Sequence, residues 1–455
     1  MAAFAWDVHS EEGKDAVVRK PLVALVGRPN VGKSTLFNRL VGERLAIVHE
    51  TPGTTRDRHY ADVEWQGRVF TLIDTGGLMG DLPLDTITEQ VQKQAQLAIE
   101  EADVIVFITD VLKGVTGADQ RIANILRRAE KPIVPAVNKV DNLERGLDLY
   151  EFYALGLGEP VGVSALRGLN TGDLLDEIVA ALSEVPLEGE VSTGVRVAVV
   201  GRTNVGKSSL LNQLLGQERV IVSEMPGTTR DAVDTSITYA GEEVTLIDTA
   251  GIRRRGRVER GIEQYSVLRA LRAIGRADVV LLVIDALDGV TAQDAHIAGY
   301  IVDEFKSVAV LINKWDLVEK DAHTATLFEE HVRYRLKFMP YAPVLFVSAL
   351  MGQRVDRVLP LAMHLYRERY VHLEDAEVSD MLQEAIARRS PPRGRGKRLV
   401  IYEGHQAGVA PPTFAFTVND KRLVHFDYER YLKNRIRERY LFEGTPLRLT
   451  FSNRR

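Results

Sequence analysis

The strongest constraint on this chain of 455 residues is a glycine-rich pattern that occurs twice. The pattern Gly-x-x-x-x-Gly-Lys-Ser starts at Gly27 and starts again 174 positions later, at Gly201. Apolar runs at 23–26 and 197–200 precede the two copies and predict buried strands, and helical patterns follow each copy. Backbone N–H groups of such a loop, together with the N-terminus of the next helix, bind the phosphates of a nucleotide. The sequence therefore predicts two phosphate-binding loops.

Four further motifs follow each loop in the same order. In the first and second copies they are Pro-Gly-Thr-Thr-Arg-Asp at 52–57 and 226–231, Asp-Thr-Gly/Ala-Gly at 74–77 and 248–251, Asn-Lys-x-Asp at 138–141 and 313–316, and Val-Ser-Ala-Leu at 163–166 and 347–350. A single glycine-rich loop can be an ordinary turn. Five motifs in one order, four of them repeated after 174 or 175 residues, instead indicate a duplicated domain.

Strand-like and helical segments alternate within each copy, and this alternation predicts the fold class. The expected strands are 70–74, 104–110 and 133–138 in the first copy and 244–248, 279–285 and 308–313 in the second. We therefore expect two α/β domains with doubly wound, mostly parallel sheets, which bind ligands at the carboxyl ends of their strands.

The end of the chain predicts a third, small α/β domain. Its expected elements are helices at 378–388 and 428–440 and strands at 398–402, 413–418 and 446–451. The helix at 428–440 carries an apolar stripe at Leu432 and Ile436 and a basic face at Arg430, Lys433 and Arg437. The predicted organisation is a disordered extension at 1–20, nucleotide-binding domains at 21–184 and 195–371, a linker at 185–194 and the small domain at 372–455.

Composition limits the classes of partner and compartment. The chain has no cysteine, which excludes disulfides, thiolate zinc sites and thiol catalysis. No apolar run approaches the length of a membrane span, and the first twenty residues lack the apolar core of a signal peptide. We therefore expect a cytoplasmic protein with no membrane partner. Residues 372–455 carry 16 Lys and Arg against 11 Asp and Glu, which fits either a nucleic-acid face or an ordinary solvated surface.

The first three motifs predict the phosphate and Mg²⁺ sites. The lysines neutralise the β and γ phosphates, the serine and aspartate serve the metal, and the threonine closes over Mg²⁺ when the γ phosphate is present. The expected loop residues are Gly27, Arg28, Pro29, Asn30, Val31, Gly32, Lys33 and Ser34, and Gly201, Arg202, Thr203, Asn204, Val205, Gly206, Lys207 and Ser208. The expected metal residues are Ser34, Thr55, Asp74, Ser208, Thr229 and Asp248. Gly77 and Gly251 are expected to donate their backbone N–H groups to the γ phosphate. The nucleotide-binding residues expected from this motif are Asp74, Thr75, Gly76, Gly77 and Leu78, and Asp248, Thr249, Ala250, Gly251 and Ile252.

The last two motifs predict the base. A carboxylate such as Asp141 or Asp316 accepts hydrogen bonds from the ring N–H and the exocyclic amine of guanine, a pair of donors that adenine does not present. GTP and GDP are therefore the expected nucleotides. The expected guanine-site residues are Asn138, Lys139, Val140, Asp141, Ser164 and Ala165, and Asn313, Lys314, Trp315, Asp316, Ser348 and Ala349.

These motifs carry a family resemblance. With the segments Arg-Tyr-Leu-Lys-Asn-Arg at 430–435 and Phe-Glu-Gly-Thr-Pro-Leu-Arg-Leu at 442–449, the chain resembles the bacterial ribosome-assembly GTPases of the Der (EngA) family from about residue 20 to its end. The resemblance implies tandem Era/TrmE-like G domains, a C-terminal KH-like domain, GTP hydrolysis and a role in maturation of the large ribosomal subunit. We expect the large subunit and its rRNA as partners, no DNA, and a monomer.

The resemblance also bears on catalysis. Ras-like enzymes place a water-orienting glutamine where this chain has Leu78 and Ile252, and neither side chain can orient water. In related GTPases the first asparagine of the loop, here Asn30 and Asn204, ligates K⁺ beside the phosphates. The resemblance thus implies a catalytic set of Lys33, Asn30, Thr55 and Gly77, and of Lys207, Asn204, Thr229 and Gly251.

One departure and three alternatives remain. RNA-binding KH domains clamp RNA with a Gly-x-x-Gly loop, which residues 372–455 lack. A P-loop kinase would share the lysine and serine but has no need of duplicated Asn-Lys-x-Asp motifs. A tRNA-modifying GTPase has one G domain and a cysteine-bearing C-terminal motif. A scaffold in which one G domain binds GTP without hydrolysing it has the same motifs.

Overall fold

The computed structural model describes residues 20–42, 60–78, 96, 98–141, 144–184, 194–217, 220–222, 234–249, 265–394 and 397–454. These residues form two compact units, of which the second begins at Gly194. Nearly all of the predicted extension at 1–20 and of the predicted linker at 185–194 lies outside the described residues, and the proposed domain boundaries stay predictions. Within the described ranges, no helix has the length and apolar character needed to span a bilayer.

The first unit is built on a sheet that has six strands among the described residues, in the order β2-β3-β1-β4-β5-β6. The strands are β1 (Leu22–Val26), β2 (Tyr60–Trp65), β3 (Arg68–Asp74), β4 (Val104–Asp110), β5 (Ile133–Asn138) and β6 (Val161–Gly162). All neighbours pair in parallel except β2, which is antiparallel to β3. The helical elements are α1 (Lys33–Gly42), α2 (Thr75–Leu78), η2 (Val111–Lys113), α4 (Gly117–Leu126), η3 (Glu144–Leu155) and α5 (Thr171–Glu184).

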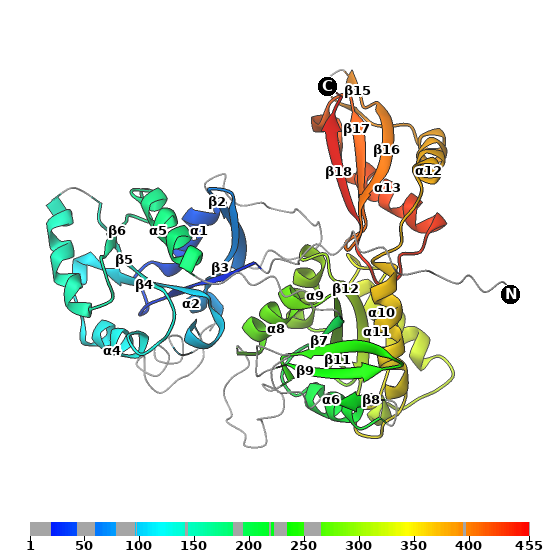
Figure 1. Cartoon of the computed structure of the whole chain (residues 1–455), viewed down its shortest axis with the longest axis horizontal. Coiled ribbons are helices and arrows are strands. Elements are labelled where there is room, and N and C mark those ends of the chain that lie inside the picture. Colours follow the sequence, from blue (N-terminus) through cyan, green and yellow to red (C-terminus); the bar gives the residue numbers. More distant parts are fainter. Residues whose placement is uncertain are drawn as a thin grey trace. The chain divides into compact units, whose positions relative to one another are not determined.

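Both faces of this sheet are covered by helices. In β4, Val104 and Val106 pack with α1 and α5 on one face, whereas Ile105 and Phe107 pack with α4 and η3 on the other. Every residue of β4 is buried, as expected for a central strand of a parallel sheet. This arrangement is the doubly wound fold that the alternating pattern predicted, and it is visible in the blue and cyan part of Figure 1.

The second unit repeats this plan. Its sheet has the order β13-β12-β11-β7-β10-β9-β8. The strands are β7 (Val195–Val200), β8 (Val220–Val222), β9 (Thr235–Tyr239), β10 (Glu242–Ile247), β11 (Val279–Asp285), β12 (Ser307–Asn313) and β13 (Val344–Phe346). The helical elements are α6 (Lys207–Leu215), α8 (Tyr265–Arg276), α9 (Ala292–Asp303), η5 (Trp315–Leu317), α10 (Thr324–Arg335), η6 (Val355–Arg357) and α11 (Val358–Glu368).

The sequence missed the short strands at both edges of each large sheet, including β6 and β13. Strands β2 and β9 are antiparallel to their neighbours β3 and β10, and β8 pairs with β9. Their residues alternate between buried and more exposed positions or are few in number, so they lack the continuous apolar runs that mark the central strands. The sheets remain mostly parallel, as predicted.

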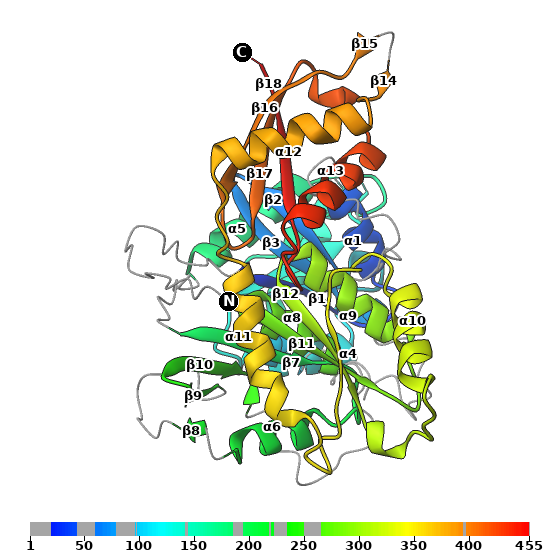
Figure 2. The ribbon, with the colours of Figure 1, turned by 90° about the vertical axis from the view of Figure 1, so that its right-hand side faces the viewer.

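The end of the second unit is a three-stranded sheet, β16-β17-β18, with two helices on one face (Figures 1 and 2). Its elements are α12 (Asp375–Arg388), β14 (Arg393–Gly394), β15 (Lys397–Arg398), β16 (Ile401–Gly408), β17 (Thr413–Val418), η7 (Lys421–Leu423), α13 (Phe426–Arg439) and β18 (Arg448–Asn453). The small α/β domain is therefore confirmed. The strand predicted at 398–402 is wrong in extent, because β16 continues to Gly408 through glycines and polar residues that do not read as a strand.

The predicted basic face of α13 is only partly right. Leu432 and Ile436 are fully buried, as predicted, and Arg430 is exposed. Arg437, however, is turned into the protein, where it donates hydrogen bonds to the carbonyl oxygens of Leu441, Phe442 and Thr445. Helical spacing placed Arg437 correctly on the helix, but the turn that receives its guanidinium comes later in the chain.

This turn, residues 441–446, joins the small domain to the second nucleotide-binding domain. The N–H of Val308, in β12, donates to the carbonyl of Gly444 at 2.7 Å, and the Gly444 N–H donates to the carbonyl of Tyr341 at 2.9 Å. The Arg437 guanidinium lies 4.1 Å from the centre of the Tyr341 ring. Burial lowers the pKa of Arg437 to about 10. This contact of the turn 441–446 with Val308 and Tyr341, which we call the joint, is therefore polar and lies between two hydrophobic cores.

We expect Arg437→Ala to destabilise the second unit by about 2–4 kcal/mol, because three carbonyl groups and the Tyr341 ring lose a buried charged donor. Urea unfolding measures this loss. Arg430→Ala is the matched control on the same helix, where an exposed arginine changes the free energy of unfolding by about 0.5 kcal/mol or less. Equal effects of the two substitutions would contradict the role of Arg437 in the joint.

A second prediction concerns Lys306, which is buried next to the joint and donates to the carbonyl of Gly275 at 3.0 Å. Burial lowers its pKa to about 8. Between about pH 8 and 10.5 the unfolded chain therefore binds a proton that the folded chain does not, so this group adds stability as the pH rises through that window.

Lys306→Met removes the buried charge. We expect the variant to be more stable than the parent at pH 7, by up to about 3 kcal/mol, and this difference to fall below about 0.5 kcal/mol at pH 10.5. Thermal unfolding of both proteins at the two pH values checks this, and a difference independent of pH would contradict it.

Candidate functional site

Each phosphate-binding loop connects the central strand of its sheet to the following helix, β1 to α1 and β7 to α6. The second glycine of each pattern adopts the left-handed conformation, with φ 94° at Gly32 and 97° at Gly206. At the first glycine, Gly27 or Gly201, a Cβ atom would collide with a carbonyl oxygen of the neighbouring strand. The glycines are therefore required by backbone conformation and by close packing.

The loop lysines lie inside their own loops. Lys33 Nζ donates to the carbonyl oxygens of Gly27 at 2.7 Å and of Arg28 at 2.9 Å, and Lys207 makes the same pair of bonds to Gly201 and Arg202. Burial lowers the pKa of Lys33 to about 8, and the nearby Arg28 charge adds to this effect while Asp74 opposes it. A phosphate group placed in the loop would supply the negative charge that this buried ammonium lacks.

Two of the three residues predicted to serve Mg²⁺ in the first domain, Ser34 and Asp74, are in contact. Ser34 Oγ donates to Asp74 Oδ2 at 2.5 Å, and the Asp74 carboxylate is fully buried at the end of β3. Asp74 also accepts from the N–H of Gly76 at 3.0 Å, and Thr75 Oγ1 donates to the carbonyl of Leu25 at 2.6 Å. A hydroxyl and a carboxylate at the mouth of a phosphate loop are donors suited to a hard divalent cation.

In the second domain, Ser208 is the second residue of α6 and Asp248 follows β10. The backbone of Asp248 is in the left-handed region, with φ 57°, and its N–H donates to Asp234 Oδ1 at 2.9 Å. Asp234 also forms an ion pair with Arg276 of α8. Thr249 shares a hydrogen bond with Thr235 at 2.6 Å. The start of this motif is therefore held by a different set of side chains in the second domain.

The asparagine of each Asn-Lys-x-Asp motif joins the phosphate loop to the guanine loop. Asn138 Nδ2 donates to the Val31 carbonyl at 2.8 Å, and Asn138 Oδ1 accepts from the Ala165 N–H at 3.0 Å. Asn313 makes the equivalent bonds, to Val205 at 2.8 Å and from Ala349 at 2.9 Å. Three motifs that are distant in sequence thus meet at one buried amide in each domain.

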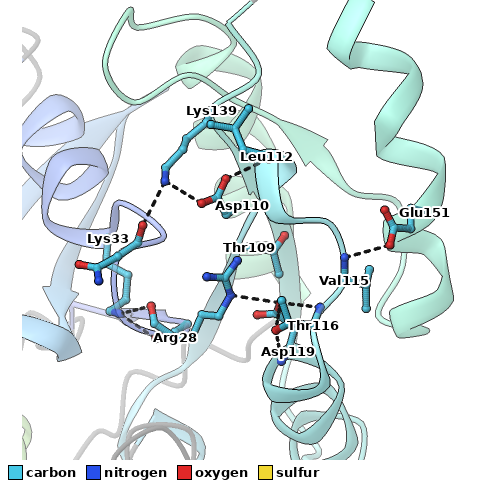
Figure 3. A network of polar contacts seen from close by, with 12 residues as sticks. Arg28, Lys33, Thr109, Asp110, Leu112, Val115, Thr116, Asp119, Lys139 and Glu151 are labelled. Atoms are coloured by element: carbon cyan, nitrogen blue, oxygen red, sulfur yellow. Dashed lines mark hydrogen bonds and ion pairs between the residues drawn. The ribbon is translucent and has the colours of Figure 1, made fainter. Parts of the chain in front are cut away.

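The lysine of the motif adds a second link. Lys139 Nζ donates to Asp110 Oδ2 at 2.6 Å, a contact drawn in Figure 3. It also donates to the carbonyl oxygen of Asn30 at 3.1 Å. In the second domain Lys314 forms an ion pair with Asp285 at 2.5 Å. The lysine is therefore positioned by a carboxylate at the end of β4 or β11.

The two aspartates predicted to recognise guanine differ in their hydrogen bonds. Asp141 Oδ1 accepts from Ser164 Oγ at 2.6 Å, and the Ser164 oxygen accepts from the N–H of Arg167. Asp316 Oδ1 is buried and has no hydrogen-bond partner among the described residues. A buried carboxylate oxygen without a donor is costly, and the N–H groups of guanine are donors of the required kind.

Some predicted residues lie outside the described part of the chain. These are Thr55, Thr229, Ala250, Gly251 and Ile252, whose roles stay predictions. Gly77 and Leu78 belong to the short helix α2, directly after Asp74. The remaining loop residues, Pro29, Asn30, Thr203 and Asn204, follow β1 and β7, and Val140 and Trp315 follow the lysines of the guanine motifs.

Sequence reasoning missed residues that support the guanine site. Arg39 of α1 donates to the carbonyl oxygens of Ala165 and Leu166, at 3.0 and 2.5 Å. Asp110 and Asp285 hold the motif lysines. The two aspartates had a signal, because each ends an apolar strand at the same place in the repeat. Arg39 had none, because Gln213 stands at the equivalent position of the second copy.

We expect Asp141→Asn and Asp316→Asn each to weaken GTP binding at its own site by at least about 100-fold, because one carboxylate acceptor becomes a donor facing guanine N–H groups. Xanthine nucleotides carry a carbonyl in place of the exocyclic amine, so they should bind the variant sites instead. Titration with fluorescent guanine and xanthine nucleotides measures both effects. Unchanged guanine affinity would contradict the assignment of these aspartates.

Comparison with known families follows the same division of the chain. The model of the family described as "50S ribosome-binding GTPase" matches residues 22–139 and again residues 196–314. The model described as "KH-domain-like of EngA bacterial GTPase enzymes, C-terminal" matches residues 373–452. The two G-domain matches contain both phosphate loops and both Asn-Lys pairs of the guanine motifs.

Full-length relatives are similar over nearly the whole chain. GTPase Der of Symbiobacterium thermophilum is 55% identical over 436 residues, which cover 96% of this chain and 93% of that protein. GTPase Der of Chloroflexus aggregans is 53% identical over 441 residues, covering 96% of this chain and 98% of the relative. GTPase Der of Desulforamulus reducens is 51% identical over 435 residues, with the same coverage.

Proposed function

The chain belongs to the Der (EngA) family of bacterial GTPases, and from this premise we propose that it is a nucleotide-dependent switch in maturation of the large ribosomal subunit. As a family member it binds GTP and GDP, hydrolyses GTP and binds the 50S ribosomal subunit. The observation that best supports a switch at both sites is the buried asparagine, Asn138 or Asn313, which joins the phosphate loop to the guanine loop in each domain.

The residues of each site divide the work of hydrolysis. Bound Mg²⁺ supplies positive charge at the β and γ phosphates and would be held by Ser34 with Asp74, and by Ser208 with Asp248. Lys33 and Lys207 add positive charge at the same phosphates, where a transition state with spread negative charge needs it. Thr55 and Thr229, which lie outside the described residues, would add a hydroxyl ligand to the metal when the γ phosphate is bound, and this contact would be lost after hydrolysis.

We propose K⁺ as the additional catalytic charge, since neither Leu78 nor Ile252 can orient water. Asn30 and Asn204 are exposed and share one left-handed backbone conformation, with φ 66° and 64°. The two asparagines therefore have equivalent backbone geometry in the two copies.

Hydrolysis should accordingly be faster in K⁺ than in Na⁺ at equal ionic strength, by about tenfold or more, since each 1.36 kcal/mol of transition-state stabilisation is a factor of ten. Asn30→Ala together with Asn204→Ala should remove the difference. Steady-state release of phosphate measures both. Equal rates in the two salts for the parent protein would eliminate the role of K⁺.

For the small domain, we propose contact with rRNA through the groove between α12 and α13. The groove is lined by Met381, Glu384, Ala385, Arg388, Arg435, Glu438 and Arg439. Arg388 and Arg439 are exposed there and face acidic partners only at 3.7 Å. Phosphate groups bind such arginines with a strong dependence on salt.

Co-sedimentation with large ribosomal subunits tests the switch and the groove together. We expect association with a non-hydrolysable GTP analogue, release with GDP, and at least fivefold weaker association for the double variant Arg388→Glu, Arg439→Glu. The control, Arg335→Glu with Lys337→Glu, makes the same change of charge on exposed residues of the second G domain. Association that is equal in all nucleotide states would refute the switch. Equal losses in the double variant and control would refute the groove.

The remaining proposals follow from the site of action. A protein that acts on ribosomal subunits works in the cytoplasm, and each G domain of this chain contains the loop, metal and guanine motifs in one polypeptide. We therefore propose that it acts there as a monomer.

A further inference from the structure

The second residue of each phosphate loop is an arginine whose side chain leaves the loop. In Figure 3 the guanidinium of Arg28 lies beside Asp119, a residue of α4. Arg28 Nε donates to Asp119 Oδ2 at 3.2 Å, and both side chains are nearly or fully buried. Only the main chain of Arg28 faces the lysine of the loop, through its carbonyl oxygen.

The same pair occurs in the second domain. Arg202 Nε lies 3.1 and 3.3 Å from the two carboxylate oxygens of Asp294, which is fully buried in α9. Arg202 Nη2 also donates to Asp288 Oδ2 at 3.0 Å. Both domains therefore contain the same arginine–aspartate pair, although the residues next to the pair differ.

The aspartate of each pair is also the third residue of its helix and belongs to the capping box at the helix N-terminus. Asp119 Oδ2 accepts from the N–H and the hydroxyl of Thr116, at 3.1 and 2.6 Å, and Thr116 Oγ1 in turn accepts from the Asp119 N–H. Thr291 and Asp294 form the same capping box at the start of α9. The carboxylate is thus fixed by its helix, and the arginine is tied to a point that cannot easily move.

We propose that Arg28 and Arg202 are positioning residues, which tie each phosphate-binding loop to the capped N-terminus of α4 or α9 and thereby hold the loop in the shape that binds phosphate. The carbonyl of Arg28 or Arg202 and that of the preceding glycine direct the loop lysine. Rotation of the arginine backbone would turn that carbonyl and the adjoining N–H group away from the phosphate position. The side-chain tether opposes this rotation without touching the nucleotide.

The two copies differ in how completely the tether is made. Where the second domain has Asp288, the first has Lys113, which is exposed. In the first domain Arg28 Nη2 and Asp119 Oδ1 are buried and lack a hydrogen-bond partner among the described residues. A buried ion pair stabilises a structure only when its remaining donors and acceptors are satisfied. The first loop is therefore held less firmly than the second.

The experiment measures each site in a background that silences the other, with Asp316→Asn to observe the first and Asp141→Asn to observe the second. Arg28→Ala and Arg202→Ala should each weaken GDP binding by about tenfold or more and should lower kcat as well as raise KM for GTP. Arg→Lys variants keep the charge but lose the guanidinium geometry, so they should fall between the alanine variants and the parent. Thermal unfolding without nucleotide separates this from a general loss of stability.

An exchange of the differing residues provides the sharper test. Lys113→Asp gives Arg28 a second carboxylate and should strengthen GDP binding at the first site about two- to fivefold. Asp288→Lys should weaken the second site by a similar factor. Arg128→Asp makes the same change of charge at an exposed position just after α4, and it should leave GDP binding unchanged.

Three results would overturn the proposal. The first is GDP affinity within twofold of the parent for both alanine variants. The second is reduced stability of the nucleotide-free protein with unchanged affinity and kcat. The third is equal effects of Lys113→Asp and Arg128→Asp. Should the alanine variants fail to fold, the exposed exchanges at 113 and 288 decide the question alone.

Discussion

Each nucleotide site depends on one buried side-chain amide. Asn138 and Asn313 use their N–H₂ group for the phosphate loop and their oxygen for the guanine loop, so neither loop can move without breaking a buried hydrogen bond. No other residue type of this size presents a donor and an acceptor in a fixed plane, apart from the one-carbon-longer glutamine. Movement of either loop would leave a buried polar group without a hydrogen bond, and this energetic cost opposes movement of both loops. The parallel sheet positions this amide, because β1, β4 and β5 end at the same edge of the sheet.

Polar and charged side chains surround this amide. Lys139 is held by Asp110, Arg28 by Asp119, and Ser34 by Asp74, and all three aspartates follow or cap elements of the same sheet edge. Asp110 and Asp74 hold side chains that face the phosphate loop or the metal position, whereas Asp119 holds the Arg28 side chain outside the loop. In each of these pairs the aspartate is fully buried and its partner is more exposed.

Most of the fold could be predicted from the sequence, and so could the motifs that the structure brings together at each candidate site. Central strands such as β4 and β11 match the predicted limits because a buried parallel strand reads as one apolar run. The loop glycines and lysines were identifiable because their chemistry fixes their spacing. Arg437 was misread because its partners are backbone carbonyls in a turn, which leave no mark on residue type. Arg39, Asp119 and Asp294 went unnoticed because their roles arise only when distant elements meet.

Strand β12 begins at the joint and ends at a nucleotide site. Its second residue, Val308, is bonded to the turn after α13, and its last residue, Asn313, is the amide of the guanine site. A strand of this length is an almost inextensible rod of about 20 Å, at roughly 3.3 Å per residue. Deleting or adding one residue between its ends would shift the register with both neighbouring strands and reverse the side on which one end points. The number of residues in β12 is therefore fixed. Insertions and deletions should be tolerated in the loops of this domain but not within 308–313.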